Sequence, residues 1–172
     1  MKTLLTVLLI STSYFLSAQS GFEISKDPDN PTTHMLVGTI SKQLIKNDTS
    51  YKWYAANQHS YKPDTAIINS FATIKAANIQ LVIFGGTWCE DTQSIIPKLF
   101  KIQEASGVPD ENITLLGVNR KKVTLGHIAE AFAITNVPTI IVMKNGKELG
   151  RVVEYGKTGK WDKELADIIK NN

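Results

Sequence analysis

The stretch IFGGTWCEDTQSIIP, residues 83–97, decides the fold because it leads from a buried strand, across a cysteine, into a helix. The apolar run QLVIFGG, residues 80–86, has a β-branched centre and predicts a strand that is buried on both faces. Apolar residues then recur at helical spacing and predict a helix from about residue 91 to 106. Cys89 stands at the junction and is the only cysteine in the chain. Any disulfide chemistry must therefore involve a second molecule.

Periodic patterns continue on both sides of this junction and alternate between helix and strand. The predicted elements are a helix over 64–78 capped by Asp64, a strand over 113–119, a helix over 124–133 with Leu125, Ile128, Ala129 and Phe132 on one face, a hairpin over 138–155 turning at Asn145-Gly146, and a helix over 161–170. Alternating helices and strands favour parallel neighbours, and the hairpin adds an antiparallel edge. The sequence therefore predicts an α/β/α sandwich with a mixed central sheet.

The first twenty residues have the pattern of a secretory signal. Lys2 precedes a short apolar run, and small residues follow at a cleavage point after Ala18 or Ser20. The run is broken by Ser11, Thr12 and Ser13, which is unlike a spanning helix of about 20 apolar residues. We expect an exported protein, either periplasmic or secreted, with residues 1–20 as its signal peptide.

Residues 21–63 form an N-terminal extension before the main domain at 64–172. Residues 21–34 are polar and turn-rich and predict an arm or linker, whereas 35–40 is a candidate first strand. One or two short helices are expected over 41–64. Four aromatic residues there are expected to cover an edge of the core: Tyr51, Trp53, Tyr54 and Tyr61.

Composition excludes several classes of function. The chain has 19 basic and 16 acidic residues, a formal charge of +3, which is too mild to indicate binding of nucleic acid or an anionic membrane. His34, His59 and His127 share no metal-ligand spacing with one another or with the cysteine. We expect no metal, no cofactor and a monomer.

Two motifs together resemble the thioredoxin superfamily. The first is TWC, residues 87–89, followed by a helix that contains Pro97; the second is FAITNVPTIIVMKNGKELGR, residues 132–151. A cysteine at a helix N-terminus faces unpaired backbone N–H groups and the positive end of the helix dipole, which favour thiolate over thiol. The resemblance implies that Cys89 is the reactive nucleophile and that Pro138 is cis and lies against it.

The same resemblance implies a substrate-binding surface made by Trp88, Val137 and Pro138, on which Val137 pairs with an extended segment. The chain departs from the family at two positions. The site is Cys-x-x-Thr instead of Cys-x-x-Cys, so Thr92 replaces the resolving thiol; its hydroxyl is expected to donate a hydrogen bond to the Cys89 thiolate. Ile83 stands where the dithiol reductases of the family carry a buried carboxylate.

These features predict an exported monothiol thioredoxin-like protein that performs thiol–disulfide exchange, as an oxidoreductase or isomerase. Its partners would be protein thiols and disulfides or low-molecular-weight thiols, handled by mixed-disulfide formation, isomerisation or deglutathionylation. The alternative is a redox-inactive thioredoxin fold that binds polypeptide in the groove between Trp88 and Val137. A thiol peroxidase is disfavoured because the Trp-Asn-Phe segment is absent and Gly86 stands where peroxiredoxins carry threonine. Arg120 follows the strand at 113–119 and could approach the thiolate.

Overall fold

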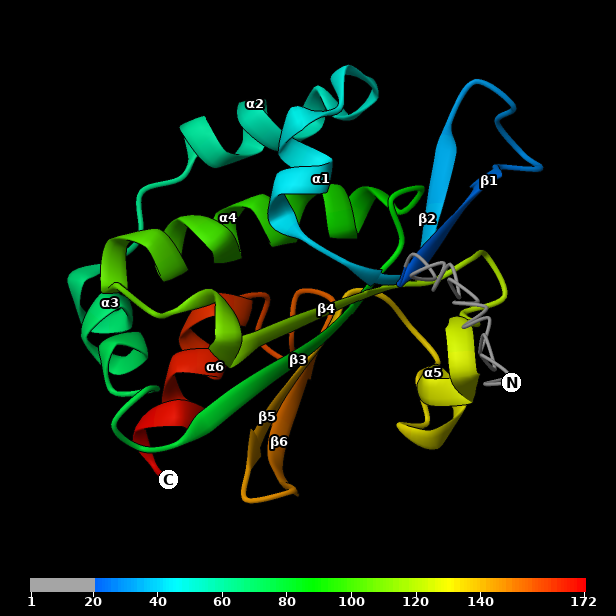
Figure 1. The fold of residues 1–172 in the computed structure, drawn as a ribbon. Coiled ribbons are helices and arrows are strands. Elements are labelled where there is room, and N and C mark those ends of the chain that lie inside the picture. Colours follow the sequence, from blue (N-terminus) through cyan, green and yellow to red (C-terminus); the bar gives the residue numbers. More distant parts are fainter. Residues whose placement is uncertain (1–20) are drawn as a thin grey trace, which may run out of the picture.

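The computed structural model describes residues 21–172 as a sheet with helices on both faces (Figure 1). The predicted signal segment, residues 1–20, lies outside the described residues. The strands are β1 (Phe22–Lys26), β2 (His34–Ile40), β3 (Ile79–Gly85), β4 (Ile113–Gly117), β5 (Thr139–Lys144) and β6 (Lys147–Val153). The helices are α1 (Lys42–Asn47), α2 (Trp53–Ser60), α3 (Thr65–Ala72), α4 (Glu90–Ser106), α5 (Ile128–Ala131) and α6 (Trp161–Lys170), with 3₁₀ turns η1 (Thr49–Tyr51), η2 (Asp110–Asn112) and η3 (Leu125–His127).

The six strands form one sheet in the order β1-β2-β4-β3-β5-β6. β3 and β4 run parallel, and the other neighbours in this described sheet run antiparallel. β3 is therefore hydrogen-bonded on both of its edges, by β4 and by β5. The predicted α/β sandwich with a mixed central sheet is confirmed.

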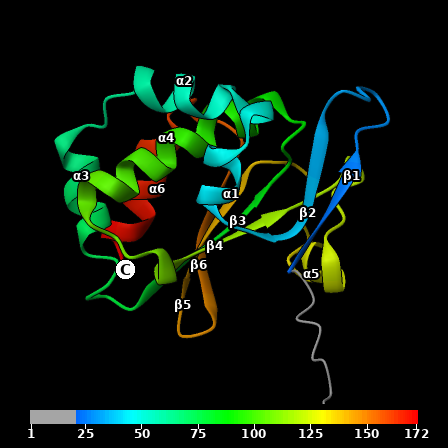
Figure 2. The same ribbon diagram turned by 45° about the horizontal axis from the view of Figure 1, so that its top comes forward.

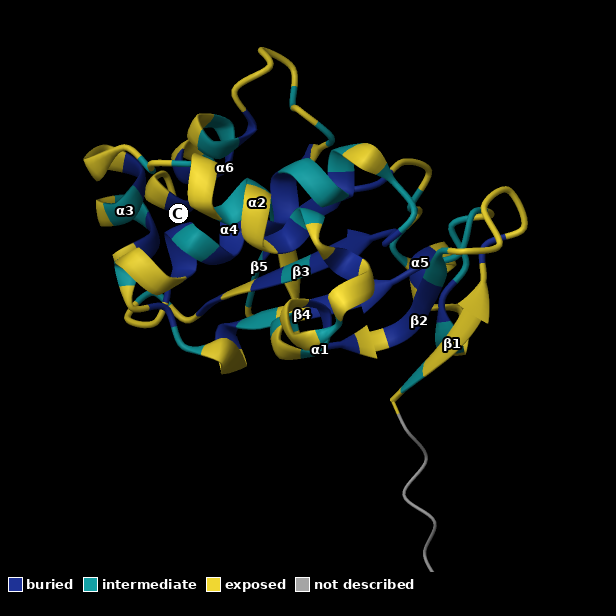
Figure 3. Ribbon diagram, turned by 90° about the horizontal axis from the view of Figure 1, so that it is seen from above, coloured by how far each residue is buried: buried dark blue, intermediate teal, exposed yellow. Residues whose placement is uncertain are grey.

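Alternate residues of β3 face two different apolar clusters. Leu81 and Ile83 belong to the larger cluster, to which α2, α3, α4 and α6 contribute. Phe84 belongs to the smaller cluster, which includes Ala129 of α5, and Val82 packs against it. Figures 1 and 2 show the same division, with α5 on the face of the sheet opposite the other helices. Most of β3 is coloured as buried in Figure 3, whereas β1 is exposed.

Short sequence patterns correctly predict where several helices and turns lie. The Asp64 carboxylate accepts a hydrogen bond from the Ala66 N–H at 2.9 Å and caps α3. Asn145 and Gly146 both have positive φ, which suits the tight turn between β5 and β6. The apolar stripe of α6 is buried through Trp161, Leu165 and Ile169.

Two predictions from the sequence are wrong. Residues 21–34 are not simply a linker, because they contain β1, which pairs antiparallel with β2. The helix expected over 124–133 is reduced to the single turn of α5. Gly126 and His127 adopt left-handed backbone conformations that break the helical path, and Ile128 is 37% exposed instead of packed in the core.

We call residues 22–40 (β1, β2 and their connection) the N-terminal hairpin. It joins the rest of the sheet at a point where two glycines face each other. Gly38 of β2 is paired with Gly117 of β4. A Cβ atom on Gly117 would overlap the carbonyl oxygen of Leu36 and lie 2.9 Å from its carbonyl carbon. The close approach of the two backbones therefore requires glycine at this position.

We predict that Gly117→Ala destabilises the protein by about 1–3 kcal/mol, because the added methyl group meets rigid backbone. Urea unfolding measures the effect. Gly21→Ala is the matched control, since its Cβ would make only ordinary contacts with Thr39, at 3.7 Å and beyond. Equal stability losses for the two variants would contradict the close approach of β2 and β4.

Candidate functional site

Cys89 lies in the connection between the end of β3 and the start of α4. It occupies the N-cap position with extended backbone angles (φ −91°, ψ 124°), and its carbonyl accepts the Gln93 N–H at 3.0 Å. Its own N–H donates to the carbonyl of Gly86 at 2.9 Å, which closes a turn before the helix. The thiol is free and half-buried. The sulfur is therefore held at the positive end of a 17-residue helix, in reach of a partner.

The second part of the site is the loop before β5. The Val137–Pro138 peptide bond is cis. The Cys89 thiol donates a hydrogen bond to the Val137 carbonyl oxygen at 3.1 Å. Trp88 and Cys89 both pack against the smaller apolar cluster, of which Val137 is a member. The structure thus brings Trp88, Cys89, Val137 and Pro138 together from two segments almost fifty residues apart.

Thr92 faces inward from the first turn of α4. It is 4% exposed, and its hydroxyl oxygen accepts the backbone N–H of Gly86 at 3.2 Å. Its methyl group lies 3.0 Å from where a Cβ of Gly85 would be. The expected hydrogen bond from Thr92 to the sulfur is not among the hydrogen bonds of residues 21–172. The threonine instead fixes the end of β3, because its side chain points toward the strand.

Ile83 is fully buried in the larger apolar cluster. The position that carries a carboxylate in the dithiol reductases is therefore filled by hydrocarbon. An isoleucine side chain at this position cannot take up or release a proton.

Trp88 is fixed by polar and cationic neighbours. Its indole N–H donates to the Val118 carbonyl at 2.9 Å. Its ring covers Gly86 so closely that a Cβ there would lie 2.6 Å from ring atoms. The guanidinium carbon of Arg120 lies 5.0 Å from the ring centroid and the Lys122 amine 5.7 Å from it, within the range of cation–π contacts.

Arg120 is anchored by the N-terminal hairpin. Its Nε and Nη2 donate to the two carboxylate oxygens of Asp27 at 2.6 and 2.8 Å, and its Nη1 lies 3.0 Å from Asp29. Asp27 is 2% exposed, whereas the Asp29 side chain is 66% exposed. The hydrogen bond from Arg120 is the main reason that the pKa of Asp27 is lowered, and the same bond raises the pKa of Arg120. The sequence did not indicate Asp27, since it lies in a polar, turn-rich stretch.

A second contact ties the hairpin to the cysteine loop. The Thr87 hydroxyl is buried, donates to the His34 carbonyl at 3.0 Å and accepts the Leu36 N–H at 3.3 Å. The Thr87 carbonyl in turn accepts the side-chain amide of Gln93 at 2.9 Å. The loop that presents Cys89 is therefore held by β2 as well as by its own helix.

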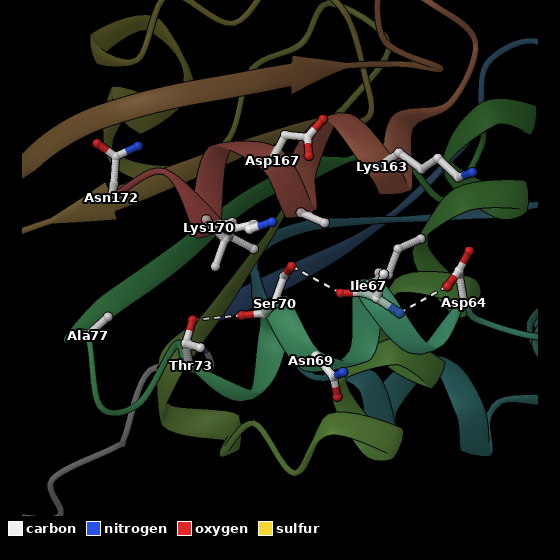
Figure 4. Close-up of a pocket in the computed structure, with 13 residues that line it drawn as sticks. Asp64, Ile67, Asn69, Ser70, Thr73, Ala77, Lys163, Asp167, Lys170 and Asn172 are labelled. Atoms are coloured by element: carbon white, nitrogen blue, oxygen red, sulfur yellow. Dashed lines mark hydrogen bonds between the residues drawn. The ribbon is translucent and has the colours of Figure 1, made fainter.

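A groove of about 730 Å³ lies between α3 and α6 (Figure 4). Three of its polar side chains bond within α3: Asp64 caps the helix, Ser70 bonds to the Ala66 carbonyl and Thr73 to the Ser70 carbonyl. None of the predicted site residues lines it.

The described residues contain neither a cluster of metal-ligating side chains nor a helix that could span a membrane. Within residues 21–172, no group of three or more histidine, cysteine or acidic side chains could hold a metal ion. No helix in that range is long and apolar enough to cross a membrane.

Comparisons with known proteins agree with this geometry. The Thioredoxin family model matches residues 66–171. Thioredoxin from Echinococcus granulosus is 33% identical over 101 residues, which cover 59% of this chain and 84% of that protein. Thioredoxin from Mycobacterium tuberculosis (strain ATCC 25618 / H37Rv) is 31% identical over 104 residues, covering 59% and 85%.

Two solved structures are similar in fold. An HIV epitope scaffold aligns with a TM-score of 0.53 at 18% identity, over 74% of this chain and 90% of the scaffold. A Pseudomonas aeruginosa protein of unknown function aligns with a TM-score of 0.52 at 19% identity, over 74% and 89%. At these identities the likeness concerns the fold alone.

The fold and site define an α/β protein in which a cysteine at a helix N-terminus meets a cis-proline loop. The chain belongs to the thioredoxin family. This membership supports a thioredoxin-like redox role in general terms.

The Asp27–Arg120 pair predicts a specific pH dependence of stability. The folded pKa of Asp27 lies below its ordinary value of 3.8, so the pair stabilises the protein above that pH, and the contribution is lost as the pH falls through the folded pKa. We expect Asp27→Asn to lower the free energy of unfolding near neutral pH and to flatten its decline in acid. Urea unfolding at a series of pH values from about 6 to about 2 tests this.

Asp29→Asn is the control, because it removes the same charge from the same loop at an exposed position. An Asp27→Asn variant that loses stability in acid as steeply as the wild type would show that the ion pair contributes nothing.

Proposed function

We propose that the protein performs thiol–disulfide exchange through Cys89 alone, with protein thiols and disulfides or low-molecular-weight thiols as partners. The observation that carries the proposal is the contact of the half-buried Cys89 thiol with the Val137 carbonyl at 3.1 Å, at the start of α4. The N-terminus of α4, the free Cys89 sulfur and the cis-proline loop lie together at this site. Thiolate at such a point is the nucleophile of disulfide exchange.

The exchange proceeds in two steps. The Cys89 thiolate attacks one sulfur of a partner disulfide, a new S–S bond forms to Cys89, and the other partner sulfur leaves as a thiolate that takes a proton from water. A second thiol from solution, as its thiolate after losing its proton to water, then attacks the partner sulfur of the mixed disulfide; a new S–S bond joins these two sulfurs, the bond to Cys89 breaks, and Cys89 leaves as the thiolate. The second thiol must come from outside, since Thr92 occupies the resolving position and Cys89 is the only cysteine of the chain.

Ionisation of Cys89 would also open the partner-binding surface. The thiol proton that now bonds to the Val137 carbonyl is lost when Cys89 becomes the attacking thiolate, so this oxygen becomes free to accept. Within residues 21–172 no hydrogen bond engages the Val137 N–H. Both backbone groups of Val137 would then be able to pair with an extended partner segment, as in strand addition. Trp88 would support this segment beside the sulfur.

We further propose that the protein is exported. The support is the sequence pattern of residues 1–20, with Lys2, the apolar run and the small residues at 18 and 20. An oxidising compartment outside the cytosol would supply disulfide-bonded partners.

We predict that the wild-type protein accumulates as a mixed disulfide when it is treated with glutathione disulfide or a disulfide-bonded protein. Thr92→Cys should release the partner and form an internal disulfide, because a thiol at that position attacks from within. Non-reducing gels and intact-mass spectrometry measure both. Cys89→Ser is the blank.

Absence of any Cys89 adduct on the native protein would reject the exchange function. If Cys89→Ser still captured the same polypeptides without a covalent bond, the alternative of a redox-inactive binding module would be favoured.

Export has its own test. Expressed with its natural N-terminus in a Gram-negative host, the protein should be recovered from the periplasm or medium with a mature N-terminus after Ala18 or Ser20, as read by mass spectrometry of the intact chain. Substituting an apolar residue of the run by arginine should retain the precursor, because a charge in that region blocks signal recognition. Recovery of the wild-type protein from the cytosol at its full length would contradict export.

A further inference from the structure

Trp88 is connected to the N-terminal hairpin through one arginine. Arg120, on the loop after β4, makes a two-point ion pair with Asp27, a residue 93 positions away, at 2.6 and 2.8 Å. Its guanidinium carbon lies 5.0 Å from the centroid of the Trp88 ring. The hairpin is thus connected to the residue next to the cysteine.

All three side-chain nitrogens of Arg120 pair with carboxylates of the protein. Nε and Nη2 bond to Asp27, and Nη1 pairs with Asp29. A guanidinium that is bound at both oxygens of one carboxylate has its plane fixed. Two carboxylates also compensate its single charge. The arrangement therefore suits holding an aromatic ring in place better than binding an external anion.

Trp88 in turn sets the backbone that presents Cys89. Its indole N–H is bonded to Val118, and its ring covers Gly86. The Gly86 carbonyl accepts the N–H of Cys89 at 2.9 Å. Release of the ring would therefore loosen the turn that aims the sulfur at Val137.

We propose that Asp27 is a positioning residue for Cys89: it fixes Arg120 over Trp88, and Trp88 fixes the Gly86–Cys89 turn. The effect on reactivity rests on the proposed exchange function, whereas the effect on Trp88 does not. The N-terminal hairpin is accordingly part of the site.

Charge changes separate this geometric role from an electrostatic one. Asp27→Asn removes one negative charge from the surroundings of Trp88, whereas Arg120→Ala removes one positive charge. A purely electrostatic role would therefore change Cys89 reactivity in opposite directions in the two variants. A positioning role lowers it in both. Asp29→Asn changes the charge as Asp27→Asn does, but it leaves the buried ion pair intact. Arg120→Lys keeps the charge and loses the two-point geometry.

Two readouts test the proposal on the full folded protein. The first is the second-order rate of Cys89 with 4,4′-dithiodipyridine, a small neutral disulfide. We expect Asp27→Asn, Arg120→Ala and Arg120→Lys to slow it about threefold or more, and Asp29→Asn to stay within about twofold of the wild type. The second is hydrogen exchange of the Trp88 indole N–H by NMR, assigned from its loss in Trp88→Phe. Exchange should be faster in the same three variants only. Unfolding midpoints confirm that every variant is folded under the assay conditions.

Opposite rate changes in Asp27→Asn and Arg120→Ala, or equal behaviour of Asp27→Asn and Asp29→Asn in both readouts, would overturn the proposal. If wild-type Cys89 did not react with the disulfide, the exchange function would fail, and the indole exchange rates would still decide whether Asp27 positions Trp88.

Discussion

Strand β3 is hydrogen-bonded along both edges and packed on both faces, and the other layers take their positions from it. Leu81 and Ile83 are buried under the helices on one side, while Phe84 is buried on the other. Burial of side chains of this size contributes about 1.5–3 kcal/mol each. The strand can shift by one residue only by exchanging the two faces, so its register is fixed. Because its end is fixed, the loop that follows it presents Cys89 at a defined place.

The N-terminal hairpin is held by a different kind of force. β1 is exposed along most of its length and buries little apolar surface. The hairpin is secured instead by the glycine contact with β4, by the hydroxyl of Thr87 and by the buried Asp27 carboxylate. A buried carboxylate is costly unless it is paired, so the hairpin has one low-energy position, in which Arg120 completes the pair. Such a contact specifies geometry more than it adds stability.

The patterns that predicted the structure correctly are local ones. The continuous apolar run of β3, the Asp64 cap and the Asn145-Gly146 turn act through neighbours a few residues away. β1 was missed because an edge strand obtains its hydrogen bonds from β2 and needs no apolar face. The cysteine, tryptophan and cis-proline loop were predicted through family resemblance. The Asp27–Arg120 pair could not be predicted, since no local pattern relates residues 93 positions apart. The bond in which the Thr92 hydroxyl accepts the Gly86 N–H was not predicted, because spacing does not reveal which way a side chain points.

A single thiol changes what the rest of the site must do. In a dithiol site the second cysteine limits how long a partner stays bound, whereas here that position holds a buried threonine bonded to Gly86. Under the proposed exchange function, the lifetime of a mixed disulfide depends on how easily an outside thiol reaches the bond. Access is governed by the groups around the half-buried sulfur, chiefly Trp88 and the Val137 loop. Under that function the Trp88 ring beside the sulfur would limit the directions from which a second thiol approaches. The anchoring of Trp88 by the N-terminal hairpin is consistent with a site in which selectivity among thiols replaces internal release.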